Sequence, residues 1–130
     1  MRAYQLACEL LDEAWPDAER LQRHPITREI APQLYAAVGS ILANLNDGYS
    51  RSSGRDRARF FEYALASTRE SIGWYQSGQP VLGGQITERR MEVLAEIRRL
   101  LLAIIPRERT RLIRPTRRSD PAADSARSPQ

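Results

Sequence analysis

Apolar residues return every three or four positions along most of this chain, which is the periodicity of an amphipathic α-helix. Breaks of about three to seven residues, rich in proline, glycine and serine, interrupt the pattern. No stretch alternates apolar and polar residues in the manner of a half-buried strand. The pattern therefore predicts an all-α fold, an antiparallel up-down-up-down four-helix bundle. The expected helices cover about residues 2–22, 27–50, 54–77 and 85–105.

The third of these segments has the clearest period. One face carries an apolar row, and the opposite face carries a polar row that we expect in water. The apolar row is Phe61, Leu65, Thr68, Ile72 and Tyr75, and the polar row is Arg55, Arg59, Glu62, Ala66 and Arg69. Ser53, three residues before Asp56, fits the start of a helix whose first free N–H groups are capped by side chains. Pro16 predicts a kink or break in the first helix, and Gly78 to Gly84 predicts the end of the third.

Length and composition narrow the class of protein. A chain of 130 residues suits one domain, which we place at 1–113, and the Arg/Pro/Ser-rich segment 114–130 has the composition of a disordered tail. One cysteine excludes an intramolecular disulfide. The first residues lack the apolar core of a secretory signal, and the longest apolar run, at 100–105, is far too short to cross a membrane. We therefore expect a cytoplasmic protein with no membrane contact.

The residues needed for catalysis are scarce, so we predict no enzyme activity, no catalytic residue, no bound metal and no cofactor. His24 stands before a proline in a turn and is interpreted as solvated. The acidic residues of the first helix, which include Glu13 and Asp17, are interpreted as a solvated face. Three glutamates share a face near residue 92, but bundle metal sites pair such residues with a histidine that is absent here. Gly83-Gly84 lacks the lysine and hydroxyl residue of a phosphate-binding loop.

Positive charge collects in two places along the chain. All 20 basic residues are arginines, whose planar guanidinium suits phosphate oxygens. Ten of them fall within residues 86–118, where only four glutamates oppose them. We predict that RNA or DNA binds here through its backbone, because no aromatic platform for bases is interleaved with either group. The predicted contact residues are Arg107, Arg109, Arg111, Arg114, Arg117 and Arg118, with Arg51, Arg55, Arg57 and Arg59 at the preceding turn.

The apolar run at the end of the fourth segment points to self-association. A helix on the outside of a monomeric bundle needs only one apolar stripe, whereas this run is apolar on every side. A second interpretation is that this end lies centrally within one bundle. The predicted homo-oligomer interface consists of Leu100, Leu101, Leu102, Ile104 and Ile105.

Residues 38–75 contain a distinctive stretch. It reads Asn44-Leu45-Asn46-Asp47-Gly48-Tyr49-Ser50-Arg51-Ser52-Ser53, followed by Arg59-Phe60-Phe61, Ala64-Leu65, Ser67 and Glu70. This stretch resembles the signature of the four-helix-bundle proteins encoded in 23S rRNA intervening sequences, and the resemblance extends over about residues 1–110. Asn46, Asp47 and Ser50 stand where that family usually has Ala, Glu and Gly.

The resemblance implies a bundle that assembles into a ring-like homopentamer. Its fold is similar to that of the accessory variability determinant of diversity-generating retroelements, a basic bundle that works beside a reverse transcriptase and its RNA. We therefore expect a nucleic-acid-binding protein, with RNA favoured over DNA, that serves as an accessory factor to a reverse transcriptase. The alternative is a protein–protein interaction scaffold whose arginines meet an acidic partner surface without touching nucleic acid.

Overall fold

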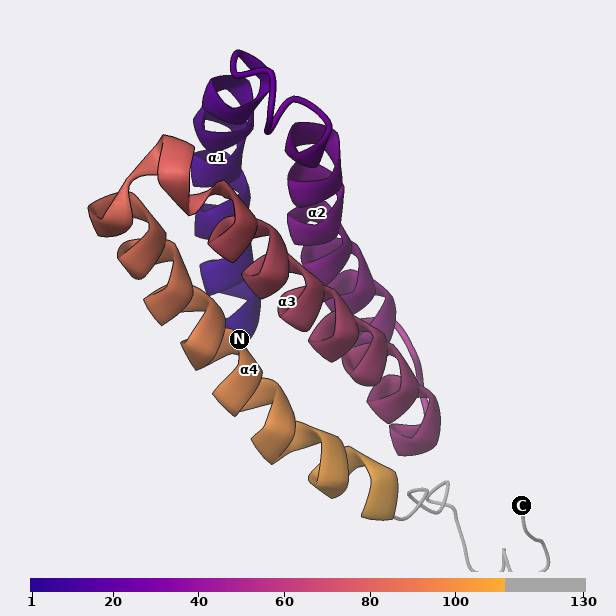
Figure 1. Ribbon diagram of the computed structural model, residues 1–130. Helices are drawn as coiled ribbons and strands as arrows, with labels where there is room; N and C mark the ends of the chain where they lie inside the picture. The colour runs from indigo at the N-terminus through magenta and orange to yellow at the C-terminus, as the bar shows by residue number, and fades with distance from the viewer. Residues whose placement is uncertain (112–130) are drawn as a thin grey trace, which may run out of the picture.

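The computed structural model describes residues 1–111, which form four α-helices and no strand (Figure 1). The prediction of an all-α, four-helix protein is confirmed for this part of the chain. The predicted tail at 114–130 and the end of the predicted domain at 113 lie outside the described residues. The helices are α1 (Arg2–Gln22), α2 (Ile30–Tyr49), α3 (Gly54–Leu82) and α4 (Gly84–Thr110).

Three prolines lie inside helices, and two of them, Pro80 and Pro106, were expected to lie beyond a helix end. Pro16, Pro80 and Pro106 fall within α1, α3 and α4, so the predicted helix ends near residues 77 and 105 are wrong. Each proline is exposed to solvent, and so is the residue four positions before it. A proline frees the carbonyl four residues earlier, and on an exposed face that carbonyl reaches water. The helices therefore continue through these positions.

The connection between α3 and α4 is a single residue, shorter than the predicted break. Gly83 has φ 90° and ψ 155°, a conformation that is open to glycine and strained for other residues. Its N–H donates a hydrogen bond to the carbonyl of Gln79 at 2.8 Å, which closes the last turn of α3. At the other end of α3, the Ser53 hydroxyl accepts the Asp56 N–H at 3.1 Å, which confirms the predicted cap.

The core lies between the four helices and contains side chains from all of them. On α3, Phe61, Thr68 and Tyr75 are fully buried while the predicted polar row is exposed, so the predicted faces of this helix are confirmed. Gly48 lets α2 approach closely, because a Cβ there would lie 2.5 Å from the Phe61 ring. The largest fully buried aliphatic side chains are Leu10, Leu21, Leu34, Ile41, Leu45, Leu94, Ile97 and Leu101.

The two ends of the molecule differ in which helices they contain. Figure 1 shows the α1–α2 turn and the Gly83 junction at one end, and the α2–α3 turn with the end of α4 at the other. Because α1 has 21 residues and α3 has 29, α1 does not reach this second end. In residues 1–111, no helix is both long and apolar enough for a membrane crossing.

Candidate nucleic-acid interface

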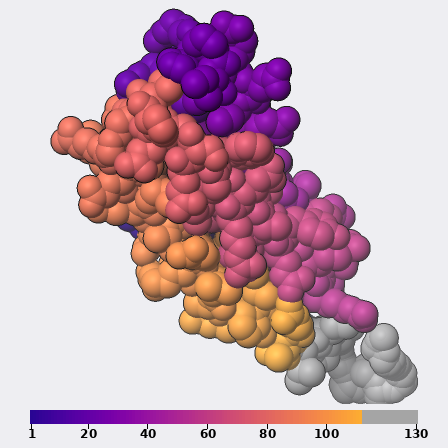
Figure 2. Space-filling model, viewed as in Figure 1, coloured from indigo at the N-terminus to yellow at the C-terminus, as the bar shows by residue number. Residues whose placement is uncertain are grey.

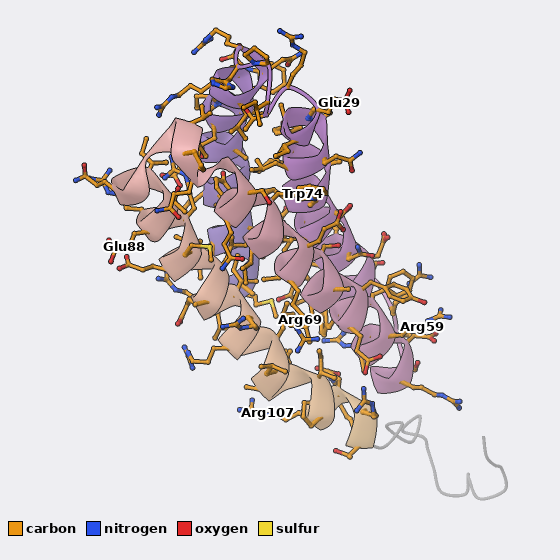
Figure 3. The ribbon with its side chains drawn as sticks, viewed as in Figure 1. Glu29, Arg59, Arg69, Trp74, Glu88 and Arg107 are labelled. Carbon is orange, nitrogen blue, oxygen red and sulfur yellow. The ribbon has the colours of Figure 1, made fainter. Side chains whose placement is uncertain are left out.

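The fold brings the two arginine groups of the sequence to the same end of the molecule. The first turns of α3 lie beside the last turns of α4, as the adjoining colours in Figure 2 show. In Figure 3, Arg59 points outward from α3 on one side of this end, and Arg107 points outward from α4 on the other side. Seven arginines meet four acidic residues here: Arg51, Arg55, Arg57, Arg59, Arg107, Arg109 and Arg111 against Asp47, Asp56, Glu62 and Glu108. We call these seven residues and their surroundings the arginine end.

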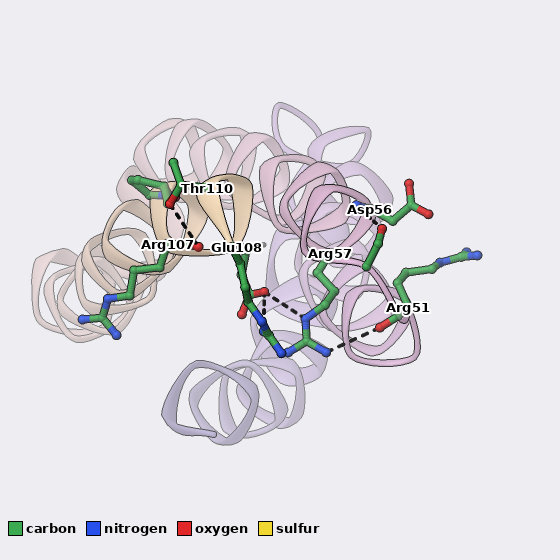
Figure 4. Close-up of polar contacts among 9 residues, drawn as sticks. Arg51, Asp56, Arg57, Arg107, Glu108 and Thr110 are labelled. Carbon is green, nitrogen blue, oxygen red and sulfur yellow. Dashed lines mark hydrogen bonds and ion pairs between the residues drawn. The ribbon is translucent and has the colours of Figure 1, made fainter. Parts of the chain in front are cut away.

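A buried carboxylate joins α3 and α4 at the arginine end. The Glu108 side chain is 8% exposed, and its Oε1 accepts from Arg57 Nε at 3.1 Å and from Arg111 Nη1 at 2.8 Å (Figure 4). Gly54 permits the approach, since a Cβ at this position would clash with the Glu108 backbone carbonyl. A buried charge needs such partners, because an isolated one is costly to desolvate. Glu108 therefore fixes where α4 ends relative to α3.

A hollow of about 590 Å³ opens between α3 and α4 at this end. Three arginines border it, and two of them are held by neighbouring carboxylates. Arg109 pairs with Glu62, and Arg59 Nη2 lies 3.8 Å from Asp56 Oδ1. The lining residues are Arg55, Asp56, Ala58, Arg59, Glu62 and Arg109. The hollow is polar and cationic, with the dimensions of a small-molecule or phosphate site.

The remaining arginines differ in what they contact. Arg55 and Arg107 are exposed, and neither forms an ion pair with any residue of 1–111. The carbonyl of Arg51 accepts a hydrogen bond from Arg57 Nη1 at 3.4 Å, which ties the α2–α3 turn to α3. Arg57 is largely enclosed, so it acts within the fold more than at its surface. The predicted contacts Arg114, Arg117 and Arg118 lie outside the described residues.

Aromatic rings lie among these arginines, contrary to the sequence interpretation. The Cζ of Arg51 is 4.3 Å from the centre of the Phe60 ring, and the Cζ of Arg59 is 5.2 Å from it. Tyr63 meets Phe60 edge to face, with ring centres 5.5 Å apart, and is 47% exposed. The spacing of residues along one helix does not show that the α2–α3 turn returns Arg51 to the Phe60 ring.

The predicted oligomer interface divides between the core and the surface. Leu101 and Ile105 are buried within the chain itself, at 0% and 5% exposure. Leu100 and Ile104 are half-buried, and Leu102 is 50% exposed. Of the five predicted residues, these last three retain surface for contact with a second copy.

A second polar cluster, away from the arginine end, was missed by sequence reasoning. Asp17 is 2% exposed, so the interpretation that it belongs to a solvated acidic face is wrong. Its Oδ2 accepts from the Tyr75 hydroxyl and from Arg90 Nε, both at 2.7 Å, and Arg90 Nη1 lies 3.3 Å from Glu13. The signal was present in the spacing, because Asp17 falls between Ala14 and Leu21 on the buried stripe of α1.

Burial changes the pKa values of Tyr75 and Arg90 in this cluster. Desolvation raises the pKa of Tyr75 far above its ordinary value, and the hydrogen bond to the Asp17 carboxylate raises it further. The pKa of Arg90 is also raised, because hydrogen bonding to Asp17 and the charges of Asp17 and Glu13 outweigh its desolvation. Tyr75 therefore stays neutral and Arg90 stays charged at neutral pH. The cluster joins α1, α3 and α4 as a structural element.

Tyr49 lies beside Glu108 with its hydroxyl buried. Its oxygen has no hydrogen-bond partner among residues 1–111, and its ring packs edge to face on Phe61 and Tyr4. Burial raises the pKa of Tyr49; the Arg57 charge opposes this effect and the Glu108 charge adds to it. The hydroxyl thus stays protonated, as a donor facing the inner side of the arginine end.

Neither a group of metal ligands among the described residues nor a matching protein identifies what the arginine end binds. Within the described residues, no three His, Cys, Asp or Glu side chains are grouped so that they could hold a metal ion. Comparisons with protein-family models, with curated proteins and with solved structures found no match to this chain. The resemblance at residues 38–75 therefore stays a prediction, and the proposals below depend on the geometry of the arginine end.

Proposed function

We propose that this protein is not an enzyme and that its arginine end binds the phosphate backbone of nucleic acid, RNA in preference to DNA. One observation carries the proposal: arginines about fifty residues apart in the sequence border the same hollow, with Arg55 and Arg59 on α3 and Arg109 on α4. Guanidinium groups bind phosphate oxygens through two parallel hydrogen bonds. Their convergence from two helices places three guanidinium groups around one hollow, where Asp56 and Glu62 offset two of the three charges.

The geometry also suits a backbone ligand electrostatically. The hollow lies at the first turns of α3, where the helix dipole favours negative charge. Arg55 and Arg107 face solvent without carboxylate partners in 1–111, so they can bind a phosphate without first breaking an ion pair. Each phosphate contact releases counterions, so binding must weaken steeply as salt rises.

The test removes the two arginines without carboxylate partners and compares them with two others. In the double variant Arg55→Gln with Arg107→Gln, we expect weaker binding to RNA of any sequence. The slope of log affinity against log salt should also fall by about 2, because each lost phosphate contact removes about one. Fluorescence anisotropy of a labelled RNA over a salt series measures both quantities.

The matched control is Arg23→Gln with Arg28→Gln. These residues are exposed at the opposite end and change the net charge by the same amount. The control should keep the wild-type salt slope. Equal loss in both double variants would mean that total charge and not the arginine end attracts the RNA, and the proposal would be abandoned.

The larger assembly is part of the same proposal. We propose that the helices form an antiparallel up-down-up-down bundle and that copies join into a ring-like homopentamer, as the family resemblance implies. A ring would repeat the arginine end and raise avidity for a long strand without any new contact. In this form the protein would serve as an accessory factor to a reverse transcriptase.

The alternative function is a protein–protein interaction scaffold without direct nucleic-acid contact. Two exposed apolar side chains favour it: Trp15 is 57% exposed beside Tyr35, and Ile26 is 82% exposed. Both lie away from the arginine end, on α1 and at the α1–α2 turn. Under this alternative, purified protein binds no RNA at low salt, which the anisotropy series reveals in its first measurement.

A further inference from the structure

The arginine end contains a row of π-systems as well as charge. The guanidinium groups of Arg51 and Arg59 both lie over the Phe60 ring, with their Cζ atoms 4.3 and 5.2 Å from its centre. Tyr63 stands one turn further along α3, 5.5 Å from Phe60 at an interplanar angle of 84°. Tyr63 is 47% exposed, so about half of its surface is open to solvent.

We propose that the arginine end selects single-stranded nucleic acid, with a base stacked on Tyr63 and on the adjoining guanidinium of Arg51 or Arg59. This inference rests on the proposed function and specifies its substrate class. Aromatic rings and guanidinium planes are the groups on which proteins stack unpaired bases. A duplex keeps its base faces inside its own stack, so it can use the arginines but not the rings.

Arg59 lies where the cationic hollow meets the aromatic rings. Its side chain borders the cationic hollow with Arg55 and Arg109, and its guanidinium also lies over Phe60. The hollow and the aromatic row thus lie on either side of one residue of α3. A strand whose phosphates occupy the hollow therefore has its bases within reach of the rings, the arrangement of a stacking platform beside a charged groove.

The contacts of Phe60 and Tyr63 divide their roles. Phe60 is half-buried and flanked by Arg51 and Arg59, so its main effect is to hold those guanidinium groups. Tyr63 makes an edge-to-face contact with Phe60 and leaves much of its ring to solvent. The exposed part of the ring is free to stack on an unpaired base.

The experiment compares single and double strands of one sequence against matched Tyr63 variants. Anisotropy is measured with a labelled RNA of about 12 nucleotides, within the usual site size of such surfaces, and with the same strand annealed to its complement. The wild-type protein should bind the single strand more tightly. Tyr63→Leu should weaken single-strand binding by about 5- to 150-fold, the loss of one stacked base, and leave duplex binding unchanged. Tyr63→Phe keeps the ring and should bind like the wild type.

The outcomes separate this inference from the proposed function. If both strand forms bind equally and Tyr63→Leu changes neither, the arginine end binds backbone alone, and the single-strand inference is overturned while the proposed function stands. If neither form binds, both fall. A polyglutamate peptide of equal charge serves as the competitor: displacement of the single strand at equal concentration would identify the surface as a site for acidic protein and would also overturn the inference. Circular dichroism melting confirms that Tyr63→Leu is folded, as its exposed position leads us to expect.

Discussion

At the scale of single residues, the buried carboxylate of Asp17 depends strongly on its hydrogen-bond partners. It is enclosed by α1, α3 and α4, and its two oxygens accept three hydrogen bonds from Tyr75 and Arg90. Such a group is tolerated only while its partners remain, because removing one leaves a charge in a medium that solvates it poorly. The cluster therefore specifies the relative positions of three helices more than it adds net stability.

Arg90→Met tests this view of the cluster. We expect it to lower the free energy of unfolding by about 3–5 kcal/mol, because the Asp17 carboxylate then stays buried without its cation. Adding Asp17→Leu removes the stranded charge, so the double variant should be more stable than Arg90→Met alone. Urea denaturation followed by circular dichroism measures each value.

A surface ion pair provides the comparison. Arg99 pairs with Glu96 near the surface of α4, and Arg99→Met should change the stability by no more than about 0.5 kcal/mol. The single variant Asp17→Leu completes the comparison. If the double variant loses as much stability as the two single variants added together, Asp17 and Arg90 are energetically independent, which would contradict this view of the cluster.

At the scale of helices, the one-residue junction at Gly83 sets how α3 meets α4. Gly83→Ala should lower the stability by about 1–3 kcal/mol, because φ 90° with ψ 155° is a conformation that only glycine adopts without strain. Space is not the obstacle, since a Cβ there would contact nothing within 4 Å. Thermal melting measures the loss.

Gly73 supplies a control of opposite sign. It lies within α3 on the exposed side, and a Cβ there also meets nothing within 4 Å. Gly73→Ala should therefore raise the stability by about 0.5–1 kcal/mol, the ordinary gain of alanine over glycine in a helix interior. A gain at both positions would show that the junction is not held in the glycine-only conformation.

The helices and most of their ends could be predicted from sequence, but the C-terminal ends of α3 and α4 could not. Periodicity identified the buried and exposed faces of α3, because burial depends on which side of a helix a residue occupies. The continuation of α3 and α4 through Pro80 and Pro106 depends on solvent reaching one carbonyl, which local rules for proline do not consider. The same limit applies to Asp17, whose partners are 58 and 73 residues away along the chain.

The sequence showed which arginines belong to the candidate site, but it did not show how they are arranged in space. Both arginine groups were recognisable from charge alone. Their convergence follows from the nearly equal lengths of α3 and α4, which bring Arg55 level with Arg109. The stacking of Arg51 on Phe60 depends on the turn between α2 and α3, which residue spacing along one helix cannot reveal.

At the scale of the whole molecule, self-association is the prediction with the clearest measurement. We expect light scattering to give a mass several times that of one chain. Leu102→Gln should reduce that mass, because Leu102 is the most exposed member of the predicted interface. Ile26→Gln removes a still more exposed side chain at the opposite end and should leave the mass unchanged. A monomeric wild-type protein would refute the ring and its avidity.

The Gly83 junction also has a mechanical consequence. Helix α3 has 29 residues and α4 has 27, so each is about 40 Å long, and one glycine connects them. A change of only about 5° in the angle between α3 and α4 at Gly83 would displace their far ends by about 3.5 Å relative to each other. The Arg57–Glu108 and Arg109–Glu62 pairs join the first turns of α3 to the last turns of α4, so they hold the two helices together beside the hollow, at the end opposite Gly83.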